Sequence, residues 1–161
     1  LKGNFTFHLV GHLQSNKAKD AVKLFDCIHS IDRLSTAIEV DKEAKKIDTI
    51  QKILIEVNTS GEESKFGVVP SQAIELCKSI LDLHNVQCRG FMTVGPLTDD
   101  RLAIRNAFAL LKTLRDEINM KLGTSLHELS MGMSGDYDIA IEEGSTMLRI
   151  GTAIFGKRIS Q

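Results

Sequence analysis

Short apolar runs rich in β-branched and aromatic residues alternate along this chain with longer stretches of helical periodicity. Parallel strands that are covered on both faces are nearly continuously apolar, and crossover helices join each strand to the next. The alternation therefore predicts an α/β fold with about six parallel strands. These strands are expected at residues 5–10, 25–30, 53–58, 88–94, 126–131 and 147–150.

Apolar spacing predicts two helices in the first half of the chain. Residues 32–47 place apolar side chains at helical intervals, with Ser30 or Asp32 as the N-cap. A second helix should follow Pro70, because the fixed φ of proline suits a first helical turn. Its buried face is expected to contain Ile74, Cys77, Ile80 and Leu81.

Two further helices are expected in the second half. The longer one spans residues 100–122 and ends at Gly123, a natural C-cap, whereas the shorter one spans residues 136–143 and stops at Gly144. The buried face of the longer helix should contain Ala107, Phe108, Leu111, Leu114 and Ile118.

Repeated strand and helix units can close into an eightfold barrel or remain an open, doubly wound sheet. No G-x-G-x-x-G follows the first strand, and no G-x-x-x-x-G-K-S/T occurs anywhere, so the usual nucleotide cradles of open sheets are absent. We therefore expect a (β/α)8 TIM-type barrel. No linker or repeat divides the chain, so residues 1–161 are expected to form a single domain.

The charge and the cysteine content of the chain indicate which partners and which cellular location to expect. With 20 basic and 21 acidic residues, the chain has no charge excess that would attract nucleic acid or an anionic membrane. No apolar run approaches the roughly 20 residues that span a bilayer. Cys27, Cys77 and Cys88 form no paired motif for zinc or for a dithiol, and a reducing cytoplasm is the expected location.

Two loops near the carboxyl end are candidates for binding an anion. In barrels, the loops after the last two strands often hold a phosphate. Residues 130–136 form a small, glycine-rich loop whose backbone amides and Ser134 hydroxyl can receive an anion. The alternative is that Ser134 only caps the following helix while the glycines turn the chain.

Arg149 lies in an apolar run just before the pair Gly151 and Thr152. A buried guanidinium needs a charged or hydrogen-bonding partner, and a ligand in the barrel would supply one. The alternative is a structural ion pair with Glu142 or Glu143 at the barrel rim.

Other polar residues are weaker candidates. A metal site at His8 and His12 is set aside, because no carboxylate or thiolate at ligand spacing supports these histidines. Glu62, Glu63 and Lys65 are interpreted as a solvated loop rather than an acid–base group. Cys88 is expected in the core.

Motifs at these positions resemble those of the pyridoxal phosphate homeostasis protein family, whose fold is similar to the barrel domain of alanine racemase. The early motif is HLVGHLQSNK at residues 8–17, and the central one runs from EVN at 56–58 to ESKFG at 63–67. The similarity covers essentially the whole chain. It continues in GFMT at 90–93, LSMGMS at 129–134 with Asp136, EG at 143–144, RIGT at 149–152 and IFG at 154–156.

The resemblance implies that the chain binds pyridoxal 5′-phosphate (PLP), with Ser134, Gly151 and Thr152 on its phosphate and Arg149 facing its pyridine nitrogen. The cofactor-binding set implied by the family also includes Met133 and His8. A permanently charged arginine cannot accept the pyridine proton and so disfavours the protonated ring that acts as an electron sink. The family implies a carrier or regulator in intracellular PLP homeostasis rather than a catalyst, with acceptor apo-enzymes as partners and a monomer or weak dimer as the assembly.

This chain differs from the family at its amino-terminal side. The family begins with a strand that bears the lysine attached to the cofactor, and neither that β/α unit nor the next has a counterpart here. We therefore expect the first two units of the barrel to be missing, with the Schiff-base lysine upstream of Leu1. Neither Lys17 nor Lys65 is expected to replace it.

Two other classes of protein stay open at this point. One is the barrel of a PLP-dependent racemase or decarboxylase, although the single tyrosine, Tyr137, falls on the short helix after the phosphate loop and gives this class little support. The other is a phosphate-binding barrel unrelated to pyridoxal, or a fragment that serves only as an association surface. An absorption spectrum separates these, since bound pyridoxal is coloured.

Overall fold

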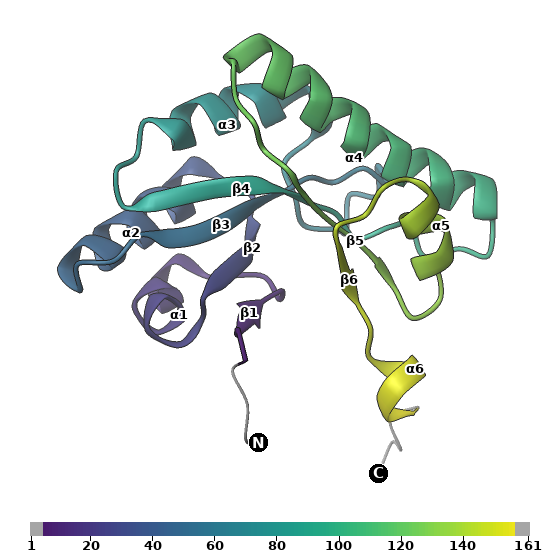
Figure 1. Ribbon diagram of the computed structural model, residues 1–161, viewed down its shortest axis with the longest axis horizontal. Coiled ribbons are helices and arrows are strands. Elements are labelled where there is room, and N and C mark those ends of the chain that lie inside the picture. Colours follow the sequence, from purple (N-terminus) through teal and green to yellow (C-terminus); the bar gives the residue numbers. More distant parts are fainter. Residues whose placement is uncertain (1–4, 157–161) are drawn as a thin grey trace.

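The computed structural model describes residues 5–156 and shows a curved parallel sheet of six strands (Figure 1). Each strand pairs in parallel with the next one along the chain, which is the pairing found in (β/α) barrels. The strands are β1 (His8–Leu9), β2 (Cys27–Ile31), β3 (Gln51–Glu56), β4 (Val86–Met92), β5 (Glu128–Met133) and β6 (Met147–Arg149).

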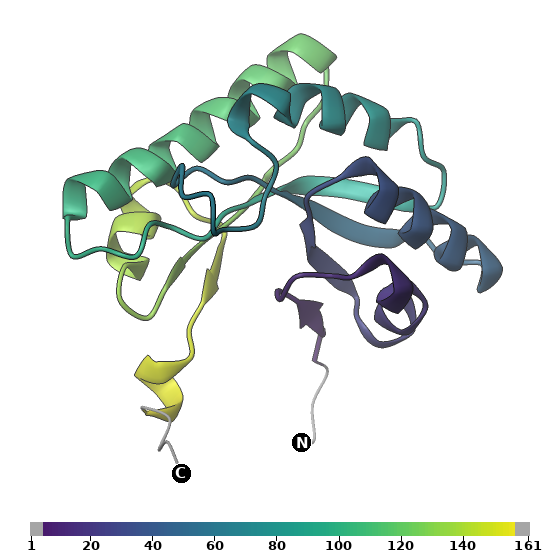
Figure 2. The same ribbon diagram turned by 180° about the vertical axis from the view of Figure 1, so that it is seen from behind.

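The first five helices cover the outer side of this sheet, each packed beside the next, whereas the last helix stands apart from them (Figure 2). Within residues 5–156, no helix combines the length and the apolar character needed to cross a membrane. The helices are α1 (Ala18–Leu24), α2 (Leu34–Lys46), α3 (Ala73–Leu81), α4 (Arg101–Leu122), α5 (Tyr137–Glu142) and α6 (Thr152–Phe155), with 3-10 turns η1 (Ser15–Lys17) and η2 (Pro70–Gln72).

Alternation of side chains along the strands creates two different faces. Ile28, Ile53, Ile55, Phe91 and Leu129 are completely buried in the core between the sheet and the helices. Full burial of a side chain of this size contributes about 1.5–3 kcal/mol, so this layer accounts for much of the fold's stability. The intervening positions face the inner, concave side, where Cys27, Leu54 and Met92 form a separate small apolar cluster.

β1 and β6 are the two edges of the sheet among the described residues. They lie on either side of the open inner face, and the described part of the chain begins and ends on this side (Figure 1). The arrangement is a parallel half-barrel, which confirms the predicted α/β fold with about six parallel strands but is not a closed (β/α)8 barrel. Its inner face is therefore reachable from solvent between β1 and β6.

The six predicted strands are all present, with ends shifted by a few residues. The four predicted helices correspond to α2, α3, α4 and α5. Asp100 caps α4 by accepting hydrogen bonds from the amides of Leu102 and Ala103, and Gly123 ends it at φ 65°. The predicted buried face of this helix is confirmed except that Leu114 is only partly buried.

Two local predictions are wrong. Neither Ser30 nor Asp32 caps α2, because the N-cap position is Arg33 and no side chain bonds to the first turn. Leu81 was expected inside, but it is 41% exposed, since the last turn of α3 rotates it away from the sheet. Two helices, α1 and α6, were not predicted. They have seven and four residues, too few for an apolar period to stand out.

Candidate functional site

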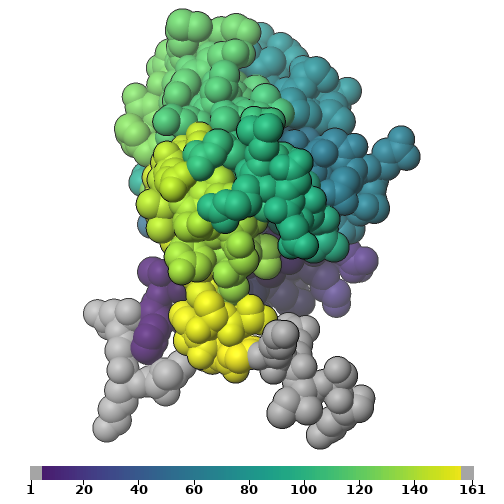
Figure 3. Space-filling model, turned by 90° about the vertical axis from the view of Figure 1, so that its right-hand side faces the viewer, coloured from purple at the N-terminus to yellow at the C-terminus, as the bar shows by residue number. Residues whose placement is uncertain are grey.

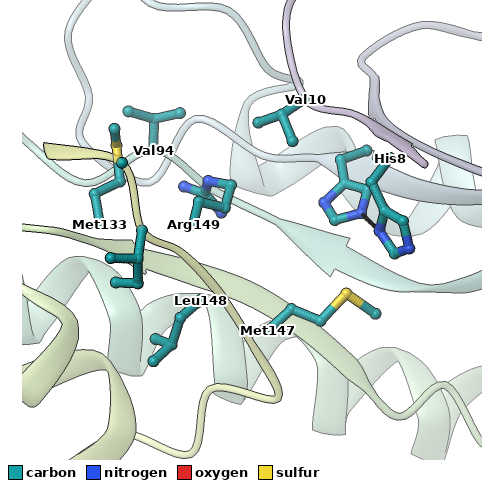
Figure 4. A pocket seen from close by; sticks show the side chains of 10 residues that line it. His8, Val10, Val94, Met133, Met147, Leu148 and Arg149 are labelled. Carbon is teal, nitrogen blue, oxygen red and sulfur yellow. Dashed lines mark hydrogen bonds between the residues drawn. The ribbon is translucent and has the colours of Figure 1, made fainter. Parts of the chain in front are cut away.

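A cavity of about 750 Å³ opens on the inner face between β1 and β6 (Figure 4). Its volume is within the range of small-molecule sites, roughly 300–1,000 Å³. The lining combines residues of the first and last strands with residues from the middle of the sheet. It consists of His8, Val10, His29, Val94, Met133, Met147, Leu148, Arg149, Ile150 and Gly151.

Arg149, at the end of β6, supplies the positive charge of this cavity. Its Nη1 donates to the Ser130 hydroxyl and its Nη2 donates to the Thr93 carbonyl, each over 2.8 Å. Burial lowers the pKa of Arg149, although the charges of Asp136 and Glu56 oppose this effect. The guanidinium is therefore fixed by neutral oxygens, which leaves its charge uncompensated at close range.

The structural ion pair considered for Arg149 is not formed. Glu142 and Glu143 both pair with Arg105 on α4 instead. Within residues 5–156, no carboxylate lies within ion-pair distance of Arg149. The hydrogen-bonding partners of Arg149 within the described residues are the Ser130 hydroxyl and the Thr93 carbonyl instead.

His29 lies in the middle of a hydrogen-bonded chain across the inner face. Its Nδ1 is 3.0 Å from the Ser130 hydroxyl, and its Nε2 is 2.8 Å from Nδ1 of His8. Burial lowers the pKa of His29 to about 4, with smaller contributions from His8 and Arg149. His29 is thus a neutral imidazole at neutral pH, and Arg149, Ser130, His29 and His8 form one connected set.

Ser134 joins the two candidate phosphate loops. Its hydroxyl accepts hydrogen bonds from the backbone amides of Gly151 and Ala153, over 3.1 and 3.2 Å. The position before α5 is taken by Asp136, whose carboxylate accepts from the Met133 amide. Ser134 therefore does not cap α5, and Figure 3 shows α6, which these contacts hold, standing out below α5.

Gly132 permits the close approach of the elements behind this loop. Its φ is +94°, and a Cβ there would lie 2.5 Å from Cβ of Ala140 and 2.9 Å from Cδ2 of Leu148. Side chains rarely adopt such a φ, so both the conformation and the space require glycine. The residue thus lets α5 and β6 pack against the end of β5.

Glu56, at the end of β3, is a buried carboxyl group that the residue pattern did not single out. Burial raises its pKa to about 7, the charge of Asp32 adds to the rise, and Arg149 opposes it. Within the described residues, its Oε2 has no hydrogen-bond partner. The signal for this group in the sequence was a single glutamate at the end of an otherwise apolar strand.

Lys65 is not the solvated residue that the loop composition predicted. Its side chain is only 19% exposed, and its Nζ donates to the Gly95 carbonyl over 2.6 Å while pairing with Glu62. It lines a second cavity of about 530 Å³ that shares Val94 and Met133 with the first. Lys17 lies away from both, on η1 in a groove beside α1.

The pair His8 and His12 is not brought together. The His12 ring stacks on Phe66 with centroids 3.9 Å apart, and its Nδ1 lies 3.7 Å from the Asp32 carboxylate. Of the predicted cofactor residues, His8, Met133, Arg149 and Gly151 line the large cavity. Ser134 contacts Gly151, and Thr152 begins α6 directly after it.

The fold and the cavity define a class of protein. Residues 3–159 match the family model described as "Alanine racemase, N-terminal domain". An alanine racemase from Clostridium difficile superimposes with a TM-score of 0.77 at 15% identity, covering 99% of this chain and 42% of the racemase. At that identity the likeness shows the fold alone.

More similar relatives identify the particular branch. The pyridoxal phosphate homeostasis protein of Aquifex aeolicus is 45% identical over 152 residues, covering 94% of this chain and 67% of the relative. That of Schizosaccharomyces pombe is 41% identical, covering 94% and 65%. The structure of PipY from Synechococcus elongatus with PLP bound has a TM-score of 0.87 at 34% identity, covering 96% and 72%. The chain belongs to the pyridoxal phosphate homeostasis protein family, and it spans about two thirds of the length of these curated relatives.

Proposed function

We propose that this protein binds pyridoxal 5′-phosphate and acts in intracellular PLP homeostasis as a carrier or regulator rather than a catalyst. The observation that carries the proposal is the placement of Arg149, whose charge enters the cavity beside the Ser134 and Gly151 loops with no carboxylate partner among residues 5–156. The names of the relatives and the PLP-bound PipY structure support the same cofactor.

The residues present fit both ends of PLP. Ser134 and the amides of Gly151 and Thr152 would hold the phosphate. The hydrogen bonds from the Gly151 and Ala153 amides to the Ser134 hydroxyl support this assignment, because they bring the two loops together. Arg149 would face the pyridine nitrogen, with Met133 and His8 as cavity walls. The cavity volume of about 750 Å³ accommodates a molecule of this size.

Arg149 also supports a role without catalysis. When bound, PLP supplies an electron-withdrawing ring that stabilises carbanions of amino acids best with a protonated pyridine. The Arg149 guanidinium, fixed by Ser130 and Thr93, donates hydrogen bonds and keeps its positive charge, so it opposes that protonation. A racemase or decarboxylase barrel remains the second candidate, supported by the alanine racemase fold. Assaying racemisation of alanine by the chain and by a full-length relative decides between them.

The half-barrel is interpreted as six strands of a (β/α)8 barrel, with about two β/α units missing from the chain. The unpaired edges of β1 and β6 and the barrel-type pairing order support this interpretation. The lysine that attaches to PLP would then lie in the missing units. Acceptor apo-enzymes are the proposed partners, and a monomer or weak dimer is the proposed assembly.

The reducing cytoplasm is the proposed location. The three cysteines are free thiols, two of them buried, as expected for a protein that needs no disulfide. The balanced charge of the chain gives it no electrostatic attraction for nucleic acid or an anionic membrane.

Titration of the purified chain with PLP, followed by its absorption spectrum and by equilibrium dialysis, tests the proposal. The full-length Aquifex aeolicus relative serves as a positive control. Retention of PLP that is competed by inorganic phosphate and weakened by Ser134→Ala supports the assignment. If PLP is not retained, or if Ser134→Ala and the control variant Ser79→Ala on α3 retain it equally, the proposed phosphate site is wrong.

A further inference from the structure

Three side chains with nitrogen and sulfur donors meet on the inner face at the amino ends of β1 and β2. His8 is the register partner of Cys27, and His29 follows two residues later on the same face of β2. One donor atom from each of the three residues lies within 4.8 Å of the others. The sequence brings His8 to this place from another strand, which is why spacing alone did not reveal the cluster.

The ring of His29 is oriented by contacts that leave one nitrogen directed into the cluster. Its Nδ1 contacts the Ser130 hydroxyl, which Arg149 holds in turn, while its Nε2 points toward Nδ1 of His8 (Figure 4). Metal-binding histidines are commonly fixed in this way by a hydrogen bond to their second ring nitrogen. Cys27 is buried, and its sulfur has no hydrogen-bond partner within the described residues.

The donor set selects the kind of ion. Two imidazoles and one thiolate match the preferences of zinc-type transition metals, whereas Mg²⁺ and Ca²⁺ require oxygen donors. We propose that His8, Cys27 and His29 form a three-ligand site for a divalent zinc-type metal ion, with the fourth position open to the inner cavity.

An ion can reach this site from solvent. His8 is exposed and lines both the large cavity and a smaller one of about 150 Å³ that also contains Cys27. The charges around the smaller cavity are balanced, so they do not repel a cation. They belong to Asp26, Lys52, Arg89 and Glu128.

The metal site lies apart from the proposed phosphate loops, but it shares His8 with the proposed PLP cavity, which His29 also lines. Those loops follow the carboxyl ends of β5 and β6, whereas His8 and Cys27 begin β1 and β2, and His29 is the middle residue of β2. The proposal does not depend on PLP, and it is tested on chain freed of PLP, because PLP itself binds metal ions. A failure here would leave the proposed function unaffected.

Calorimetric titration of the reduced chain with Zn²⁺, and absorption spectroscopy with Co²⁺, test the site. One Zn²⁺ per chain should bind, Mg²⁺ should not, and Co²⁺ should give a near-ultraviolet thiolate charge-transfer band. Cys27→Ser should abolish the band, and Cys27→Ser or His8→Ala should weaken Zn²⁺ binding by at least about 100-fold. His8→Ala changes an exposed residue, so it tests the site even if Cys27→Ser impairs folding.

Matched controls are Cys88→Ser, which changes a cysteine outside the cluster, and His84→Ala, which changes an exposed histidine. Both should bind Zn²⁺ like the parent chain. The proposal is overturned if no Zn²⁺ binds, or if His8→Ala binds it as tightly as His84→Ala does. A Co²⁺ band that persists in Cys27→Ser also overturns it.

Discussion

Arg149 and Ser130, nineteen residues apart, are joined by a hydrogen bond of 2.8 Å that fixes the positive charge of the cavity. Ser130 in turn contacts His29, so the bond connects the end of β6 to β2 across the inner face. The Thr93 carbonyl holds the other terminal nitrogen of the guanidinium. Both contacts use the two terminal nitrogens of the planar guanidinium, and a lysine, which has a single nitrogen, cannot reproduce them.

Replacing Arg149 with lysine should therefore lower the free energy of unfolding by about 1–3 kcal/mol, the cost of leaving buried acceptors without partners. Urea denaturation measures this difference. Arg33→Lys is the control, since the Arg33 side chain is 53% exposed and contacts its neighbour Asp32 and His12. Equal midpoints for the two variants would contradict the role given to the Arg149 contacts.

Ser134→Ala should weaken PLP binding by about 10-fold or more, because a hydrogen bond to a charged group is worth about 1.5–3 kcal/mol. The hydroxyl is the group on which the amides of Gly151 and Ala153 converge. Fluorescence titration with PLP gives the dissociation constants. The half-buried Ser79 on α3, which is not among the residues that line the cavity, should leave binding unchanged when it is changed to alanine.

Gly132→Ala should destabilise the protein by roughly 2–4 kcal/mol, as expected for overpacking at a strained backbone position. The new Cβ would lie 2.5 Å from Cβ of Ala140 at a φ of +94°. Gly135→Ala, in the same loop, has no atom within 4 Å of its new Cβ and should change stability little. Thermal unfolding of both variants checks the contrast, and similar melting temperatures would refute it.

Glu56 makes stability depend on pH in a defined direction. Its pKa is about 7 in the folded chain and near its ordinary value of 4.5 when unfolded. Between pH 4.5 and 7 the Glu56 carboxyl is ionised mainly in the unfolded chain, which favours unfolding. The contribution of neutral Glu56 to stability is therefore fully present below pH 4.5 and is lost as pH rises through 7. The difference corresponds to at most about 3 kcal/mol.

Glu56→Gln keeps the group neutral and should be more stable than the parent chain at pH 8, with little difference at pH 4. Denaturation curves at a series of pH values measure the effect. Glu75→Gln, at an exposed position of α3, should follow the parent chain at every pH. A parent-like pH dependence in Glu56→Gln would show that another group is responsible.

Much of the architecture could be predicted from local pattern. The strand at 53–58 and the helix at 100–122 were located because strands covered on both faces are apolar and because Asp100 and Gly123 are strong helix boundaries. The short α1 and α6 gave no comparable signal. The motifs around Ser134 and Arg149 indicate the family and its cofactor from the sequence alone.

The sequence by itself therefore determined the order of strands and helices, the candidate phosphate loops and the family. Only the tertiary structure decided which side chains meet. Arg149 bonds Ser130 and Thr93 instead of Glu142, Lys65 turns inward, and His8 joins Cys27 and His29. The physical reason is that local spacing sets the face on which a side chain lies, whereas its partners depend on strand register and sheet curvature, which form only when distant segments pack together.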